Sequence, residues 1–424
     1  TMRRVLASAK TGTIAALDIG SSKICCFIAR VDEHGRPRIV GIGQQASRGV
    51  RAGAVVDMEA AEMAIRNAVD AAERMAGETL EQVLVNLSGG SPASDTVGID
   101  VSINGHAIHD ADLQRALEPH RLTQALNGHA GHGREIVHSI PTGYAVDGAR
   151  GIQDPRGMYG GQLGVSMHVV TAASGPVKNL MHCVERCHLD VAAVVISPYA
   201  AGLAALVEDE TDLGVTLIDM GGGTTTIAVF GEGEVLHTDV VPVGGQHVTN
   251  DIARGLSTSR VHAERMKTLY GHAVAAAADE RETIEVPQVG EEDSGATQQV
   301  PRSLLTGIIQ PRLEETFELV RSHLEASGAE RIAGRRVVLT GGASQLPGIR
   351  DLAALVLDKQ VRIGRPIRVT GLAEATGGPA YATCAGLLTY AVEAETAAPR
   401  PSRPEAREPG SVLGRLGHWL REHF

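Results

Sequence analysis

Two short turns in the sequence combine a carboxylate with glycine and hydroxyl residues, the residue types that bind phosphate and magnesium. The first reads LDIGSSK and the second reads LIDMGGGTTT, and each follows an apolar segment that ends in an aspartate, Asp18 or Asp219. Successive backbone N–H groups in such a turn form a concave site for an anion. Because Mg²⁺ prefers oxygen ligands, the two aspartates could hold a hydrated Mg²⁺ between two clamped phosphates.

The two turns belong to a long-period internal repeat. Residues 12–43 and residues 214–245 each predict an apolar strand ending in aspartate, the turn, a second strand, a polar turn, a third strand and a glycine-containing exit. Such a repeat favours two related halves over a solenoid. One glycine loop alone would be interpreted as an ordinary β-turn. Two equivalent loops that both follow an aspartate indicate a nucleotide site.

A third glycine motif, VVLTGGASQLPGI, occupies residues 337–349. It predicts an apolar strand, a glycine turn and a helix that starts near residues 346–348. In isolation this motif would be a simple strand–helix turn. Beside the two phosphate turns, its glycines would let a base and a ribose lie against the backbone.

Composition restricts the partners. The net charge of −11 excludes a uniformly basic surface, so we do not expect nucleic acid as the main partner. The five cysteines form no paired framework, which is typical of a reducing compartment. No run approaches the ~20 apolar residues that a membrane-spanning helix needs.

The three motifs together resemble those of the actin-like ATPase superfamily, which includes actin, sugar kinases, heat-shock chaperone ATPases and MreB. The resemblance implies an α/β fold with two ribonuclease-H-like halves around a nucleotide cleft, and ATP and Mg²⁺ as ligands. It also implies that Asp18 and Asp219 hold the metal and that Glu264 and Lys267 contact ribose and base. The positions that match the superfamily's nucleotide-binding residues are Asp18, Gly20, Ser21, Ser22, Lys23, Asp219, Gly221, Gly222, Gly223, Thr224, Thr225, Gly244, Gly245, Glu264, Lys267, Gly341, Gly342 and Ala343.

The chain between the two phosphate turns narrows the resemblance to one branch. Residues 83–172 predict a small α+β subdomain of strand, helix, strand and strand, and its run PTGYAVDGARGIQDPRGMYGGQL closely resembles the SHS2-type subdomain inserted in the FtsA family. This resemblance implies an inserted subdomain 1C at 83–172 and an outer subdomain 2B at 246–331. The remaining parts would be subdomain 1A at 12–82, 173–210 and 374–392, and subdomain 2A at 211–245 and 332–373.

FtsA proteins act in bacterial cell division, and the resemblance implies the same role here. It implies an ATP-binding protein that self-associates into filaments at the septum, on the cytoplasmic face of the inner membrane. Subdomain 2B would bind the C-terminal peptide of FtsZ and so tether the FtsZ ring, while subdomain 1C would recruit later division proteins. Two alternatives stay open from the sequence: a pilus-assembly platform protein of the PilM type, and an actin-fold kinase of small molecules.

One segment predicts slow or negligible ATP hydrolysis. In VISPYAAGLAAL, Ser197 stands where MreB and the chaperones carry a glutamate. A serine without a partner is a poor general base. We therefore assign no catalytic residue and expect nucleotide to act mainly as a conformational ligand.

The C-terminal region predicts a tether and an amphipathic helix. Residues 393–410 are proline-rich and lack apolar periodicity, which is typical of a flexible linker. A helix over 411–424 would reach only ~20 Å, too short to span the ~30 Å hydrocarbon core. It could lie on an anionic membrane surface or dock on protein, and both the tether and the family resemblance favour the membrane. Its apolar face would consist of Val412, Leu413, Leu416, Trp419, Leu420 and Phe424.

Overall fold

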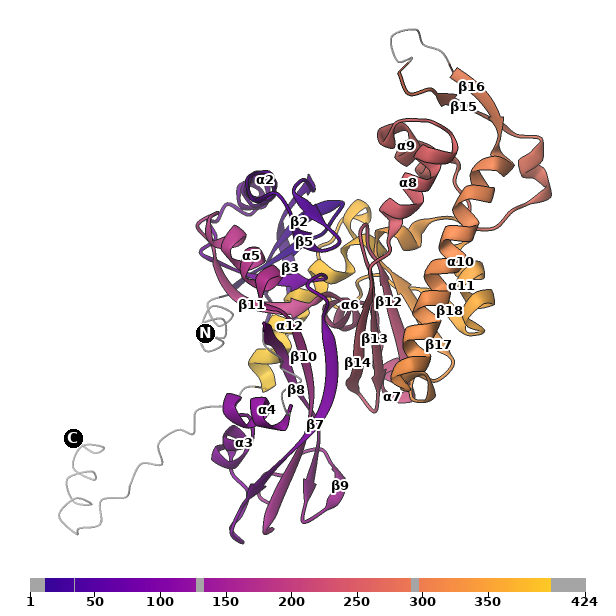
Figure 1. Ribbon diagram of the computed structural model, residues 1–424. Coiled ribbons are helices and arrows are strands. Elements are labelled where there is room, and N and C mark those ends of the chain that lie inside the picture. Colours follow the sequence, from indigo (N-terminus) through magenta and orange to yellow (C-terminus); the bar gives the residue numbers. More distant parts are fainter. Residues whose placement is uncertain (1–11, 34, 127–132, 291–296, 398–424) are drawn as a thin grey trace, which may run out of the picture.

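The chain folds into two halves, an insert and an outer subdomain (Figure 1). The computed structural model describes residues 12–33, 35–126, 133–290 and 297–397. The expected membrane helix at 411–424 therefore lies outside the described residues, as does most of the expected linker. Within the described ranges, no helix is both long enough and apolar enough to cross a membrane.

The first half is built on a five-stranded sheet of order β11-β6-β1-β2-β3. The first three strands in sequence pair antiparallel, whereas β6 and β11 extend the sheet in parallel from β1. Strands β1 and β2 are apolar and buried along nearly their whole length, as expected for strands covered on both faces. The strand bounds are β1 (Thr13–Ile19), β2 (Lys23–Val31), β3 (Pro37–Ala46), β6 (Gln82–Leu87) and β11 (Asp190–Ile196).

Helices cover both faces of this sheet. The helices α2 (Met58–Ala76) and α5 (Ser174–Glu185) pack on one face, and α6 (Ser197–Ala205) and α12 (Ala382–Ala397) pack on the other. The backbone of α2 lies so close to β3 that a Cβ atom on Gly43 would come within 1.7 Å of the Ala68 carbonyl oxygen. Glycine is therefore required at this crossing.

The second half repeats this topology. Its sheet has the order β14-β13-β12-β17-β18, with three antiparallel strands followed by two parallel ones. The helices α10 (Arg302–Ser327) and α11 (Ile349–Leu357) pack on one face, while α6 and α7 (Glu208–Leu213) pack on the other. Because α6 contacts both sheets, it lies between the two halves. The strand bounds are β12 (Val215–Met220), β13 (Thr225–Gly231), β14 (Glu234–Val241), β17 (Arg336–Thr340) and β18 (Gln360–Ile363).

The insert is a four-stranded antiparallel sheet of order β7-β10-β8-β9 with two short helices. The expected single helix is divided into α3 and α4, because Pro119 cannot continue a helix and begins a new one instead. The predicted start of the insert at residue 83 lies within β6, which belongs to the first-half sheet. The sheet of the insert begins later, at Ala93. The bounds are β7 (Ala93–Ser102), α3 (Asp110–Ala116), α4 (Pro119–Ala125), β8 (Arg134–Val146), β9 (Ala149–Ile152) and β10 (Gln162–Ala173).

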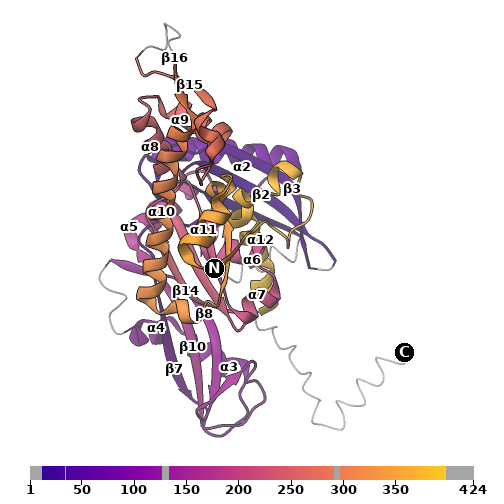
Figure 2. The ribbon, with the colours of Figure 1, turned by 90° about the vertical axis from the view of Figure 1, so that its right-hand side faces the viewer.

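The outer subdomain projects from the second half at the end of the molecule opposite the insert, in both views (Figures 1 and 2). It contains the first part of α10 and a two-stranded hairpin beside two helices. At the other end of the chain, α12 continues to Ala397, so residues 393–397 are helical and the expected linker boundary at 393 is too early. The outer elements are α8 (Gly245–Gly255), α9 (Arg260–Tyr270), β15 (Thr283–Pro287) and β16 (Thr297–Pro301).

Short elements complete the described chain. Two two-residue strands, β4 (Val50–Arg51) and β5 (Ala54–Val55), form a small ribbon beside α2. Five single 3₁₀ turns join longer elements, and two of them flank the cleft between the halves. The 3₁₀ turns span Ala277–Glu280, Ala329–Arg331, Gly342–Gln345, Glu374–Thr376 and Pro379–Tyr381.

Candidate functional site

The predicted nucleotide residues converge on one cavity between the two halves. The cavity has a volume of about 440 Å³, and its walls include the β1–β2 turn, the β12–β13 turn and the turn after β17. All of the predicted residues line it except Thr225 and Gly244. The hydroxyl of Thr225 instead donates a hydrogen bond to the Val243 carbonyl (2.8 Å). The N–H of Gly244 donates to Nδ1 of His247 (3.1 Å).

The two phosphate turns lie directly against each other. A Cβ atom on Gly222 would come within 2.0 Å of the Ser22 hydroxyl, and one on Gly223 within 2.5 Å of the Ser21 hydroxyl. Across the same gap, Nε2 of Gln246 donates to the Ser21 carbonyl (2.9 Å) and to the Ser22 hydroxyl (3.2 Å). Residues of both turns therefore line one narrow space, and turns of this kind can bind phosphate through successive backbone N–H groups.

Two carboxylates sit at the floor of this space. Burial raises the pKa of Asp18 to about 7, against the lowering effect of Lys23, and the charge of Asp219 adds to the rise. Burial likewise raises the pKa of Asp219 to about 6, although a hydrogen bond from the Thr383 hydroxyl and the charge of Lys23 lower it. Two buried carboxylates that resist ionisation together are a favourable environment for a divalent cation.

The surroundings of the two carboxylates fit a cation that shares its coordination with a ligand. Within the described ranges, no group of three or more His, Cys, Asp or Glu side chains could hold a metal by itself. Mg²⁺ commonly binds through one or two carboxylates, substrate phosphates and water, so it needs no complete cage of side chains. The hydroxyl of Thr226 lines the same cavity, is buried, and has no hydrogen-bond partner among the described residues. A polar ligand in the cavity would satisfy it.

Lys23, in the first phosphate turn, is held by residues of the 3₁₀ turn Pro379–Tyr381. Its Nζ donates to the Ala380 carbonyl (2.6 Å) and lies 3.3 Å from the centroid of the Tyr381 ring. The aromatic face stabilises the ammonium charge. This arrangement fixes a positive charge beside the two aspartates, where phosphate oxygens would need it.

The opposite end of the cavity is suited to a nucleoside. Nζ of Lys267 donates to Oε2 of Glu264 (2.7 Å) and to the Thr249 hydroxyl (2.9 Å), so the two residues predicted to contact ribose and base are held together. Gly341 has φ +84°, and a Cβ atom there would come within 2.3 Å of Oδ1 of Asp219. The glycine thus lets the turn after β17 lie against Asp219 and the second phosphate turn. Apolar groups that could face a base are Val248, Leu313, Ala343 and Leu346.

The sequence motifs missed several polar residues of the cavity. Asn86 is the penultimate residue of β6, where its side chain accepts a hydrogen bond from the Ile19 N–H (2.6 Å) and donates from Nδ2 to the Ser197 hydroxyl (3.2 Å). Thr383 in α12 donates its hydroxyl to Oδ2 of Asp219 (2.9 Å) across the two halves. Their signal was weak because each is a single polar residue in an apolar or helical segment, far in sequence from both turns.

Carboxylates are scarce where a catalytic base would be needed. Those that line the cavity within the described chain are Asp18, Asp219 and Glu264, and the last is paired with Lys267. Ser197 lies at the first turn of α6, is almost fully buried, and is hydrogen-bonded to an amide rather than to an acid. The geometry therefore offers binding groups for a nucleotide more clearly than a general base.

Comparison with known proteins gives the family. The family model for cell division protein FtsA matches residues 216–386, and the model for the SHS2 domain inserted in FTSA matches residues 89–171. The cell division protein FtsA of Agrobacterium fabrum is 46% identical over 99% of this chain and 96% of its own length. The FtsA proteins of Pseudomonas aeruginosa (36% identical; 99% and 100% covered) and Escherichia coli (33%; 97% and 98%) also match nearly throughout.

Solved structures show the fold. A PilM–PilN type IV pilus biogenesis complex matches with a TM-score of 0.62 at 18% identity, covering 89% of this chain and 98% of that one. MreB5 of Spiroplasma citri bound to ADP matches with a TM-score of 0.53 at 14% identity, covering 91% and 98%. At these identities the matches establish an actin-like fold and nothing about function. The full-length relatives are decisive, and the chain belongs to the FtsA family of cell division proteins.

Proposed function

We propose that the chain binds ATP with Mg²⁺ in the cavity between its halves. The observation that carries this proposal is that two aspartate-headed turns from opposite halves meet at one cavity. The backbone of Gly20–Lys23 and Gly221–Thr224 would hold the phosphates, and Asp18 and Asp219 would hold the metal, which neutralises phosphate charge when bound. A nucleotide-bound MreB of the same fold supports this assignment.

We infer that nucleotide acts as a conformational ligand whose hydrolysis is slow or negligible. Residues of both halves line the cavity, so a bound nucleotide would stabilise the closed arrangement over an open one. Ser197, which stands where MreB and the chaperones carry a glutamate, and its hydrogen-bond partner Asn86 line the cavity, and neither is acidic. Steady-state ATP turnover of the purified chain tests this. Fast hydrolysis that Asp219→Ala abolishes would contradict it.

We further propose that the protein forms filaments that anchor the FtsZ ring, with subdomain 2B binding the C-terminal peptide of FtsZ. Apolar side chains on this subdomain are well exposed, including Val261 (78%) and Leu269 (58%). An exposed apolar surface is a common feature of protein-binding sites. The insert, where Tyr159 is 75% exposed, would contact later division proteins.

The membrane contact would come from residues 411–424, whose apolar pattern is typical of an interfacial helix. Six partly buried apolar side chains gain ~10 kcal/mol gross, but ordering the segment costs a comparable amount at ~1 kcal/mol or more per residue. A single tail would therefore bind an anionic membrane weakly. Tails linked in a filament would bind together with avidity.

Co-sedimentation with anionic vesicles tests the anchoring role. We expect the full chain with Mg·ATP to pellet with vesicles and to bring FtsZ down with it. Removal of residues 411–424 should release both proteins. FtsZ without its C-terminal peptide should stay in the supernatant while the full chain still pellets. Vesicle binding that survives the deletion would refute the membrane assignment, and FtsZ recruitment without its peptide would refute the docking assignment.

A further inference from the structure

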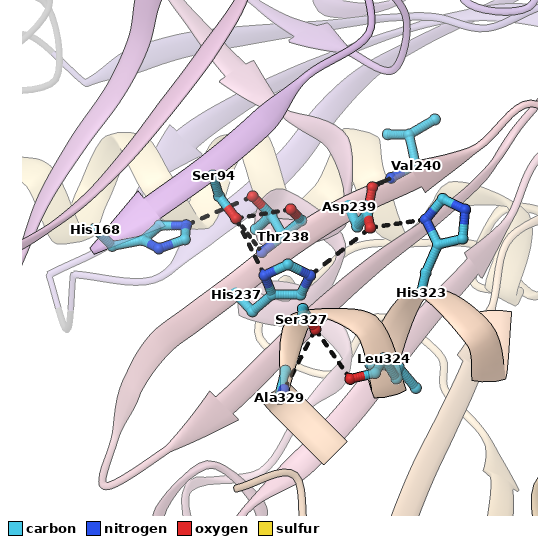
Figure 3. Close-up of polar contacts among 10 residues, drawn as sticks. All are labelled: Ser94, His168, His237, Thr238, Asp239, Val240, His323, Leu324, Ser327 and Ala329. Atoms are coloured by element: carbon cyan, nitrogen blue, oxygen red, sulfur yellow. Dashed lines mark hydrogen bonds and ion pairs between the residues drawn. The ribbon is translucent and has the colours of Figure 1, made fainter. Parts of the chain in front are cut away.

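A polar joint connects the insert to the second half, away from the nucleotide cavity (Figure 3). Strands β7, β8 and β10 of the insert all contact β14, which is an edge strand of the second-half sheet. The edge of a sheet presents unpaired N–H and C=O groups that need partners. Here a side chain of the insert supplies them for one residue of β14.

Ser94 of β7 satisfies both backbone groups of one β14 residue. The Thr238 N–H donates to the Ser94 hydroxyl (3.0 Å), and that hydroxyl donates to the Thr238 carbonyl (2.8 Å). Because a serine hydroxyl has a single proton, Nδ1 of His237 is the donor in its own contact with Ser94 (3.3 Å). The buried ring of His168, from β10, lies beside the Thr238 hydroxyl. One serine thus replaces a strand partner.

The other side of β14 is tied to α10. Nδ1 of His323 lies 2.8 Å from Oδ2 of Asp239, and Nε2 of His237 lies 3.8 Å from the same oxygen. Figure 3 shows Ser94 and His168 approaching β14 from the insert, and His323 approaching from α10. The same α10 contributes Leu313 to the nucleotide cavity. The insert and a wall of the cavity therefore hold the same stretch of β14.

This stretch of β14 continues directly into the phosphate site. Val241 pairs with Thr225, the first residue after the second phosphate turn. Beyond it, the Gly245 N–H donates to the Gly221 carbonyl (3.0 Å), and the Gln246 N–H donates to the Gly222 carbonyl (2.8 Å). A displacement of the phosphate turn would therefore be transmitted along a hydrogen-bonded hairpin to Thr238.

The joint leaves a buried polar group without a hydrogen-bond partner among the described residues. Nδ1 of His168 is buried and has no hydrogen-bond partner among the described residues, while Nε2 of His237 reaches only the Asp239 carboxylate, at 3.8 Å. Buried polar groups without partners are costly, which lowers the free-energy gap to any arrangement that pairs them. The joint is therefore less firmly fixed than one whose buried polar groups are all paired.

We propose that Ser94 is a positioning residue that couples the inserted subdomain to the nucleotide turn through β14. The inference rests on the proposed nucleotide binding. It adds the structural connection through which a bound nucleotide would affect the position of the insert. Closure of the cavity around a nucleotide shifts β14, and Ser94 makes the insert follow. Without the hydroxyl, the insert loses its hold on the edge of β14 and its position no longer depends on the nucleotide.

Hydrogen–deuterium exchange of the full chain, with and without saturating Mg·AMPPNP, tests this coupling. In the wild-type protein we expect slower exchange in the second phosphate turn and an altered exchange, by ~2-fold or more, in peptides from β7 and β10. Ser94→Ala should retain the change in the turn, with nucleotide affinity within ~3-fold, and should lose the change in the insert. Ser94→Thr, which keeps the hydroxyl, should restore it, and the exposed Ser166→Ala in β10 should behave as wild type.

Two results would overturn the inference. One is an insert response that persists in Ser94→Ala. The other is a wild-type protein whose phosphate turn responds to nucleotide while its insert does not, a comparison that requires no variant to fold. A wild-type turn that does not respond at saturating nucleotide would instead overturn the proposed nucleotide binding itself.

Discussion

The two phosphate turns occupy equivalent positions in the two halves, yet they use different chemistry. The first turn offers side-chain groups, with Ser21, Ser22 and Lys23 after the aspartate, whereas the second offers three successive glycines. The difference follows from their contact. Ser21 and Ser22 lie over the second turn so closely that a Cβ atom on Gly222 or Gly223 would collide with them. At Gly222 and Gly223 the second turn therefore has no room for side chains beside those of the first turn.

This asymmetry shows how one supersecondary unit can serve two roles in the two halves. The topology of both halves is the same, so the aspartates arrive at matching places at the ends of β1 and β12. The side chains that follow them are then constrained by the opposite half rather than by the local turn. Changes on the two sides should therefore have different consequences, which the following predictions use.

The largest effect should come from restoring a side chain to the glycine turn. Gly222→Val would place its Cβ 2.0 Å from the Ser22 hydroxyl, so we expect the halves to be held apart and the affinity for Mg·ATP to fall by ~100-fold or more. Isothermal titration calorimetry measures this. Adding Ser22→Gly should recover part of the loss, because it removes the colliding hydroxyl. Gly307→Ala, at a position with open space, is the matched control.

The second prediction tests the contribution of the metal to ATP binding separately from that of the phosphate contacts. Asp219→Asn removes one of the two buried carboxylates, so we expect Mg²⁺ to lose its ability to strengthen ATP binding, with an affinity loss of ~10- to 100-fold. Titrations with Mg²⁺ and with EDTA measure the dependence in both proteins. A variant that binds ATP as the wild type does, with the same response to Mg²⁺, would show that this carboxylate does not hold the cation.

The same carboxylates that favour cation binding should lower the stability of the ligand-free protein when they are ionised. The pKa values of about 7 for Asp18 and about 6 for Asp219 lie above those of an unfolded chain. Between about pH 4 and pH 7 the folded protein therefore binds more protons, and its stability falls as the pH rises. Thermal unfolding at pH 8 should show Asp18→Asn to be more stable than wild type by a few degrees.

Two further observations check the sign of this effect. The gain in stability of Asp18→Asn should shrink as the pH falls toward 4, where the wild-type carboxyl is already protonated. Mg·ATP should stabilise the wild-type protein more at pH 8 than at pH 6, because cation binding favours the ionised carboxylates. A stability gain that is independent of pH would mean that burial of Asp18 charge is not its cause.

The smallest effect distinguishes two adjacent threonines. The Thr226 hydroxyl lines the cavity without a partner, so Thr226→Val should reduce Mg·ATP affinity ~3- to 10-fold and leave the ligand-free protein as stable as before. The Thr225 hydroxyl bonds to Val243, so Thr225→Val should lower the unfolding temperature. Equal effects of the two variants on affinity would show that Thr226 does not face the ligand.

Local chemistry explains what could be predicted from the sequence and what could not. The turns around Asp18 and Asp219 were predictable because each is a contiguous strand–turn–strand pattern. Asn86 and Thr383 reach the cavity only through the crossing of β6 and α12, and no short motif encodes that proximity. Gln246, beside two predicted glycines, was missed as a contact between halves because its partners are more than 200 residues away.

Three predicted element boundaries differ from the structure, and each difference has a physical reason. The predicted insert starts at residue 83 and so includes most of β6, but the pairing of β6 with β1 and β11 places this strand in the first-half sheet. Pro119 divides a segment that looks helical throughout. The end of α12 lies beyond residue 393 because the apolar periodicity ends before the helical hydrogen bonding does.

A crystal structure of the full chain with Mg·AMPPNP would test the central claim most directly. We predict the triphosphate between Gly20–Lys23 and Gly221–Thr224, the cation between Asp18 and Asp219, and the base beside Ala343 and Leu346. A nucleotide bound with its phosphates outside these turns, or crystals grown at millimolar nucleotide whose cavity stays empty, would contradict the account.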